Sequence, residues 1–132
     1  MKLSIRQEYL SMVIERARKS KIEVCGLLFG RKSQGELLVE EVVEVPNSLG
    51  SEMGFRMEPT EVIRAIENAE KKGLELVGIY HSHLRCPPVP SEKDVEGMKL
   101  WPVVWLIVTP EGAARAWVLR DEKVEEVRIR TT

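Results

Sequence analysis

The sequence predicts an α/β fold, a single domain spanning residues 1–132 in which helices flank a mixed central β-sheet. Three observations lead to this prediction. A chain of 132 residues suits one domain. Hydrophobic residues make up 43% of it, enough for a buried core. Short apolar runs typical of strands alternate with segments of helical periodicity, in the order α-β-β-α-β-α-β-β-β.

The first half of the sequence contains one helical pattern and two strands. Apolar residues recur at helical spacing over residues 5–19, and Ser4 is available as the N-cap. Apolar runs at residues 22–29 and 37–45 predict two strands. Residues 46–59 follow without a regular pattern, and so long a connection in a small domain is usually functional or disordered.

The second half alternates again between the two kinds of element. Helical periodicity extends over residues 60–72, and residues 74–80 have the pattern of a strand. A proline-rich loop at residues 84–90 leads to Ser91-Glu-Lys-Asp94, which is typical of a helix start with a capping box. Three more strands are expected, at residues 103–108, 113–119 and 124–129.

Charge and composition exclude several functional classes. Twenty basic residues balance twenty-one acidic ones, for a net charge of −1, so no basic excess favours nucleic acid as a partner. The longest uncharged run, Leu100–Pro110, is too short to span a membrane. Charged residues interrupt the N-terminus too early for a secretory signal, and we therefore expect a cytoplasmic protein.

The two histidines of the chain lie at positions 81 and 83, where an apolar strand ends. Because side chains alternate along a strand, His81 and His83 point to the same face. Two neighbouring imidazoles on a rigid backbone form a natural first half of a zinc site. The plain alternative is a pair of ordinary histidines at a strand terminus.

A carboxylate follows in the predicted third helix. Asp94 comes eleven residues after His83, and a His/His/Asp set leaves one tetrahedral position open, as in catalytic zinc sites. Ser91 and Asp94 would also be expected at a helix start without any metal. Both roles are compatible, because one carboxylate oxygen can bind metal while the other accepts a backbone N–H.

One charged residue stands in an otherwise apolar strand. Glu23 lies within the run from Ile22 to Phe29, where an unpartnered charge costs several kcal/mol. It is either a strand residue that faces water or, beside a zinc site, the base that accepts a proton from water.

Together these residues resemble a known motif. The order Glu23, His81-Ser-His83, seven residues, Ser91-x-x-Asp94 resembles the motif of the JAMM (MPN-plus) zinc metalloprotease family. Two flanking stretches are similar as well, Gly78-Ile-Tyr-His-Ser-His83 and Phe55-Arg-Met-Glu-Pro59. The similarity covers nearly the whole chain, whose small size resembles a compact prokaryotic member.

The resemblance implies a fold, an activity and a role for each residue. The fold would be a cytidine-deaminase-like α/β domain, and the activity hydrolysis of isopeptide bonds made by ubiquitin or ubiquitin-like modifiers. One zinc ion per chain would be bound by His81, His83 and Asp94. Glu23 would act as general base, and the Ser91 hydroxyl would stabilise the oxyanion.

Some features depart from the motif or allow more than one interpretation. Leu84 stands where the family usually has proline, which removes a fixed φ at the loop entry. Cys25 and Cys86 are either a buried and an incidental cysteine or a disulfide, and Cys86 is also a possible replacement ligand. The segment 47–58 is a candidate contact for the substrate tail. Core or homodimer-surface positions are expected for Trp101, Trp105 and Trp117.

The leading functional hypothesis is cleavage after the C-terminal Gly-Gly of a ubiquitin-like modifier conjugated to lysine, with the modifier and its conjugates as partners. The first alternative is C-terminal processing of a sulfur-carrier ubiquitin-like protein, and the second is a non-catalytic MPN scaffold. A zinc nucleobase deaminase is disfavoured, because the chain has no Pro-Cys-x-x-Cys ligand pair.

Overall fold

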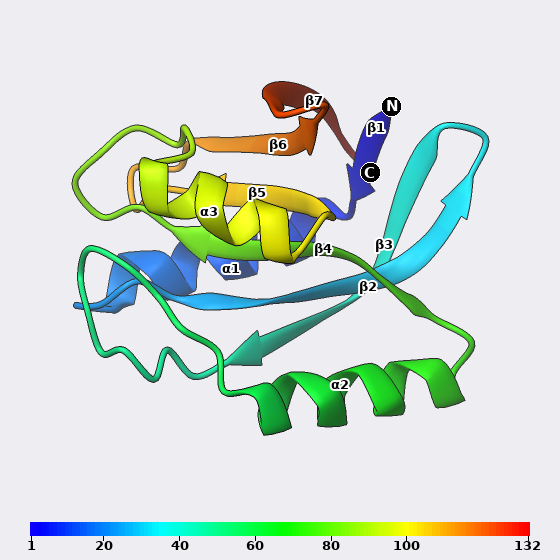
Figure 1. Cartoon of the computed structure of the whole chain (residues 1–132), viewed down its shortest axis with the longest axis horizontal. Coiled ribbons are helices and arrows are strands. Elements are labelled where there is room, and N and C mark those ends of the chain that lie inside the picture. Colours follow the sequence, from blue (N-terminus) through cyan, green and yellow to red (C-terminus); the bar gives the residue numbers. More distant parts are fainter.

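The computed structural model describes residues 1–132 and contains seven strands and three helices (Figure 1). Along the chain these are β1 (Lys2–Ile5), α1 (Gln7–Lys19), β2 (Cys25–Ser33), β3 (Glu36–Val45), α2 (Pro59–Lys71), β4 (Glu75–Ser82), α3 (Glu92–Leu100), β5 (Val104–Val108), β6 (Ala114–Arg120) and β7 (Lys123–Thr131). None of the helices is long and apolar enough to cross a membrane.

The strands form one mixed sheet in the order β1-β3-β2-β4-β5-β6-β7, which closes into a barrel through the parallel pairing of β7 with β1. β2 runs antiparallel to both β3 and β4, whereas β4 and β5 are parallel. The predicted α/β architecture with a mixed sheet is therefore confirmed. All six predicted strands and three predicted helices occur, with β2 shifted toward the C-terminus.

The prediction for the first residues of the chain is wrong. Ser4 does not cap a helix but lies in β1, between β3 and β7. α1 begins only at Gln7 and has no side-chain cap. Leu3 and Ile5 are almost completely buried, and burying two large apolar side chains stabilises the fold by more than a single cap does.

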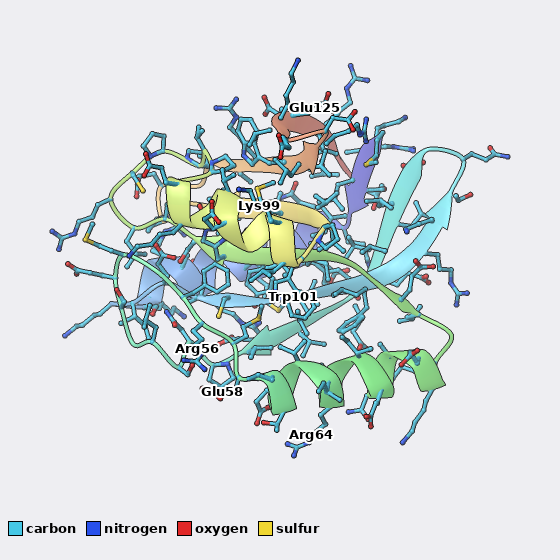
Figure 2. The ribbon with its side chains drawn as sticks, in the orientation of Figure 1. Arg56, Glu58, Arg64, Lys99, Trp101 and Glu125 are labelled. Atoms are coloured by element: carbon cyan, nitrogen blue, oxygen red, sulfur yellow. The ribbon has the colours of Figure 1, made fainter.

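The sheet separates two hydrophobic clusters, because successive side chains of a strand point to opposite faces. α1 packs on one face, in a cluster that includes Leu10, Val13, Ala17, Leu28, Tyr80 and Leu106. α2 and α3 pack on the other face, in a cluster that includes Leu27, Val62, Ala69, Ile79, Met98 and Ile107. Charged side chains such as Arg64 of α2 and Glu125 of β7 point outward, away from both clusters (Figure 2).

Several element ends meet at one end of the sheet. Cys25 pairs with His81, so the start of β2 lies beside the end of β4. α3 packs closely against β5, and Gly97 permits this approach, because a Cβ atom there would lie 2.6 Å from Cη2 of Trp105. A larger residue at this position would push α3, and the side chains at its N-terminus, away from the sheet.

Candidate metal centre and active site

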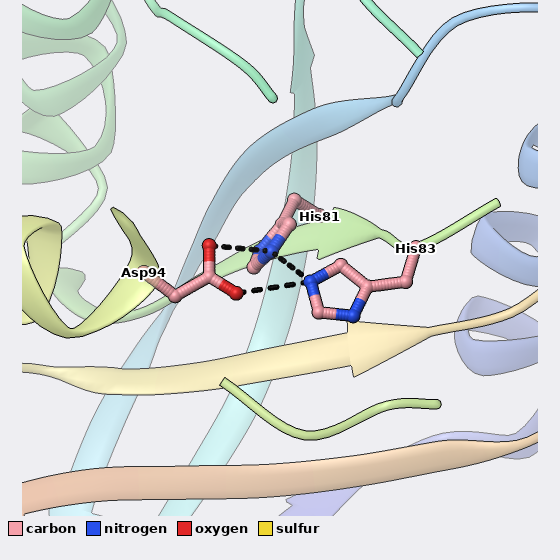
Figure 3. A group of neighbouring side chains, drawn as sticks. All are labelled: His81, His83 and Asp94. Atoms are coloured by element: carbon pink, nitrogen blue, oxygen red, sulfur yellow. Dashed lines mark hydrogen bonds and ion pairs between the residues drawn. The ribbon is translucent and has the colours of Figure 1, made fainter. Parts of the chain in front are cut away.

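Three side chains with metal-binding atoms meet where β4 ends and α3 begins (Figure 3). Nε2 of His81 lies 3.1 Å from one carboxylate oxygen of Asp94, and Nε2 of His83 lies 2.9 Å from the other. The two Nε2 atoms are 3.2 Å apart. All three residues are buried, and their donor atoms lie within 4.8 Å of one another. The structure thus brings together three of the five residues singled out in the sequence, as a group that could hold a metal ion.

The ring of His83 is oriented by the loop that follows it. Nδ1 of His83 lies 2.8 Å from the carbonyl oxygen of Pro87, an acceptor only, so this nitrogen carries the proton. Burial lowers the pKa of His83, but the hydrogen bonds to Asp94 and to Pro87 together raise it above its ordinary value. Leu84 does not prevent this arrangement, because the orienting carbonyl belongs to Pro87.

The ring of His81 is oriented by packing. Its Nδ1 atom is buried without a hydrogen-bond partner. Phe55 stacks on the ring with centroids 4.6 Å apart and planes inclined by 28°, and Trp105 meets it edge-on at 5.6 Å. Complete burial lowers the pKa of His81, which favours the neutral imidazole.

Asp94 caps α3 and also offers a carboxylate oxygen to the group formed with His81 and His83. Its backbone N–H donates to Oγ of Ser91 at 3.1 Å, and its carboxylate accepts the N–H of Ser91 at 3.0 Å. Burial alone would raise the pKa of Asp94, but hydrogen bonds from His81 and His83 hold it well below its usual range. The carboxylate is therefore ionised, and the predicted capping box is present.

Glu23 lies before β2 and not inside a strand, because β2 begins only at Cys25. It does not lie on the open surface either, since the residue is 5% exposed and lines a cleft. Burial raises the pKa of Glu23 to about 7, although the nearby His83 opposes the shift. A cleft of about 340 Å³ is lined by Glu23, His83, Ser91 and Asp94, together with residues of the segment 47–58.

Neither cysteine forms a disulfide. Cys25 is buried, and its thiol donates to the carbonyl oxygen of Val45 at 3.3 Å. Burial raises the pKa of Cys25 to about 12, which makes it unreactive. Cys86 is exposed and lines the cleft. The disulfide considered from the sequence is therefore absent, and the plain interpretation of Cys25 as a buried apolar residue is confirmed.

The tryptophans belong to the core. Trp105 and Trp117 are 2% and 8% exposed, and Trp101 packs at the edge of the same cluster. The indole N–H of Trp117 donates to the carbonyl oxygen of Pro88 at 2.8 Å, which ties the loop after His83 to β6.

Sequence reasoning missed the residues that orient the site. Phe55 lies in a stretch that resembles the family, but nothing in the sequence assigns it a role, and nothing assigns one to the carbonyl group of Pro87. These residues lie in irregular segments, where no periodicity shows which way a side chain points. The only signal for Phe55 was its membership of the stretch Phe55-Arg-Met-Glu-Pro59.

Known proteins resemble this chain over most of its length. The family model described as prokaryotic homologues of the JAB domain matches residues 6–120. A Pyrococcus furiosus protein named "Desampylase" is 47% identical over 128 residues, which cover 96% of this chain and 89% of that protein. A Thermus thermophilus protein named "Probable TtuB-protein conjugate cleaving protease" is 33% identical over 105 residues, which cover 79% of this chain and 66% of that protein.

A solved structure is similar as well. The solution structure of a protein from Desulfitobacterium hafniense superimposes with a TM-score of 0.85 at 26% identity, covering 98% of this chain and 92% of that one. These matches confirm the resemblance to compact prokaryotic JAMM-type proteins that the sequence motif suggested. Because the family match spans most of the chain, the protein belongs to the family of prokaryotic homologues of the JAB domain.

Proposed function

We propose that this protein is a zinc-dependent isopeptidase. It hydrolyses the bond that joins the C-terminal Gly-Gly of a ubiquitin-like modifier to a lysine of a conjugated protein. The observation that carries the proposal is the meeting of His81, His83 and Asp94 beside the cleft that Glu23 also lines. The names of the two relatives, a desampylase and a conjugate cleaving protease, support this class of substrate.

The donor set fits a single zinc ion per chain, bound by His81, His83 and Asp94. Two imidazoles and one carboxylate would supply three protein ligands, the number typical of catalytic rather than structural zinc sites. Nε2 of His83 is available as a ligand because Nδ1 carries the proton donated to Pro87. When bound, zinc is a Lewis acid that makes water nucleophilic at neutral pH.

Glu23 is assigned as the general base. It lines the same cleft as His83 and Asp94. In the metal-free protein burial raises its pKa to about 7, which shows that the site favours the protonated carboxyl group more than water does. Glu23 takes a proton from the attacking water and delivers it to the departing lysine amine.

Ser91 is assigned as an oxyanion donor. Its Oγ accepts the N–H of Asp94 at 3.1 Å, which uses a lone pair and leaves the hydroxyl hydrogen free to donate. The residue is exposed and lines the cleft. A hydrogen bond from this hydroxyl strengthens as negative charge develops on the scissile carbonyl oxygen, so it lowers the barrier to hydrolysis.

The cleft suits a narrow, extended tail. Leu49, Met53, Gly54 and Phe55 of the segment 47–58 form one wall of it. Leu49 and Met53 are 54% and 75% exposed and offer apolar contact area. An extended Gly-Gly tail offers little apolar area, so the folded body of the modifier supplies most of the binding free energy.

The decisive experiment compares three substrates with zinc-reconstituted protein. The first is a folded ubiquitin-like modifier joined through Gly-Gly to a lysine side chain, the second is the matched linear fusion, and the third is casein. We expect cleavage of the isopeptide conjugate, loss of activity with a chelator, and slow or no hydrolysis of the others. Preferred hydrolysis of the linear fusion would favour tail processing, and digestion of casein would contradict both readings.

Further predictions belong to the same proposal. We infer a cytidine-deaminase-like fold, one domain over residues 1–132, a cytoplasmic location and a homodimer, with neither nucleic acid nor a membrane as partner. The balanced charge of the sequence disfavours a nucleic-acid partner, and the match to the family of prokaryotic JAB-domain homologues supports the fold. Size-exclusion chromatography with light scattering tests the homodimer directly.

A further inference from the structure

The loop of residues 47–58, between β3 and α2, holds the backbone of Glu23 from both sides. The N–H of Glu23 donates to the carbonyl oxygen of Ser51 at 3.0 Å. The carbonyl oxygen of Glu23 accepts a hydrogen bond from Nδ2 of Asn47, also at 3.0 Å. Because Glu23 precedes β2, the sheet ladder does not hold it, and both of its backbone polar groups bond to this loop.

Asn47 is the centre of the loop's own hydrogen bonds. Its Nδ2 also donates to the carbonyl oxygen of Gly54 at 2.9 Å. Its Oδ1 accepts the backbone N–H groups of Leu49 at 3.1 Å and Arg56 at 3.0 Å. The side chain therefore uses both donors and both acceptor positions, a combination that aspartate cannot reproduce because it has no N–H.

We propose that Asn47 is a positioning residue for Glu23. The amide fixes the shape of the loop and at the same time anchors the Glu23 carbonyl, so the carboxylate is directed into the cleft. The inference rests on the proposed role of Glu23 as general base. In that role its distance from the attacking water decides the rate, and a displacement of about 1 Å costs on the order of 10²-fold.

The first measurement is amide hydrogen exchange by NMR in the zinc-loaded full chain. Asn47→Asp keeps the acceptor oxygen and loses both donors, so the Glu23 amide should exchange at least about tenfold faster as the loop loosens. The control is Ser48→Ala, which removes one hydrogen bond of the same loop, from Oγ to the carbonyl oxygen of Arg56 at 3.1 Å. It should leave the Glu23 amide protected.

The second measurement is a double-mutant cycle on the isopeptide conjugate. Asn47→Asp should lower kcat by about 10–10²-fold, by more than it raises KM, with one zinc ion still bound per chain. In the Glu23→Gln background, the same change should alter the residual rate by less than about twofold, because the base that Asn47 positions is gone. Asn47→Ala, which introduces no charge, should give the same pattern.

The outcomes separate this inference from the proposed function. A Glu23 amide that stays protected in both Asn47 variants would overturn the inference, and so would a loss of rate that persists in the Glu23→Gln background. Suppose that neither the wild type nor any variant cleaves a conjugate, but the Glu23 amide exchanges faster in the Asn47 variants and not in Ser48→Ala. The proposed function then fails, and the role of Asn47 in holding Glu23 in place stands.

Discussion

Replacing Glu23 by glutamine should stabilise the zinc-free protein while it removes activity. Burial raises the pKa of Glu23 from 4.5 to about 7. The folded state therefore holds this proton more tightly than the unfolded state does. Between these two pH values the free energy of unfolding falls as pH rises, and above about pH 7 the destabilisation is complete. Glutamine has the same shape and no charge, so the destabilisation disappears.

The magnitude follows from the two pKa values. They differ by about 2.5, which corresponds to an upper value of about 3 kcal/mol. Solvent in the open cleft screens the charge, so we expect a gain of about 1–3 kcal/mol at pH 8. For a chain of this size that corresponds to a rise in Tm of several degrees. Near pH 4.5 both proteins have a neutral side chain, and their Tm values should converge.

The assay is thermal unfolding followed by circular dichroism, in chelator, at several pH values between 4.5 and 8.5. Glu52→Gln is the matched control, because Glu52 lines the same cleft and is exposed. It should change Tm little at any pH. With zinc restored, Glu23→Gln should lower turnover by about 10²–10⁴-fold. A Tm difference that is independent of pH, or a variant less stable at pH 8, would refute the reasoning, and near-normal turnover would move the base elsewhere.

Three further predictions concern the neighbours of this residue. Metal analysis should find that Asp94→Ala no longer binds zinc and that Cys86→Ala still does. The reverse result would make Cys86 the third ligand in place of Asp94. Phe55→Leu should weaken zinc affinity in a competition titration by about tenfold, because Nδ1 of His81 has no hydrogen bond and the stacked ring of Phe55 helps to orient the imidazole. Unchanged affinity would assign Phe55 to packing alone. Ser91→Ala should lower the rate by on the order of 10²-fold and destabilise α3 by about 1 kcal/mol, whereas an unchanged rate would leave Ser91 with its capping role only.

The grouping of His81, His83 and Asp94 was predictable, because the signals for it are local. His81 and His83 are separated by one residue at the end of a strand, and side chains two residues apart in a strand point to the same face. The distance of 3.2 Å between their Nε2 atoms agrees with this expectation. Ser91 and Asp94 have the spacing of a capping box, and this box is present. Short-range rules of this kind need only a few residues of sequence.

The parts that could not be predicted depend on contacts between distant residues. β1 has four residues, too few for a periodic pattern, and it pairs with β7 at the opposite end of the chain. Phe55 reaches His81 from an irregular loop, and the sequence contains no rule for such a contact. Glu23 was expected inside a strand because Ile22 and Val24 extend the apolar run, yet β2 begins after them.

The register between β2 and β4 links the local signals to the contacts between distant residues. Cys25 is paired with His81. The pairing continues ahead of β2, where the N–H of Ser82 donates to the carbonyl oxygen of Val24 at 3.0 Å and Ser82 Oγ accepts the N–H of Val24 at 2.9 Å. Continued by one more residue, it sets Glu23 opposite His83. A slip of one residue would turn the Glu23 side chain toward the apolar α1 face, where an unpaired charge costs several kcal/mol. The register that buries the core therefore also sets Glu23 opposite His83, and the loop of residues 47–58 holds its backbone there through Ser51 and Asn47.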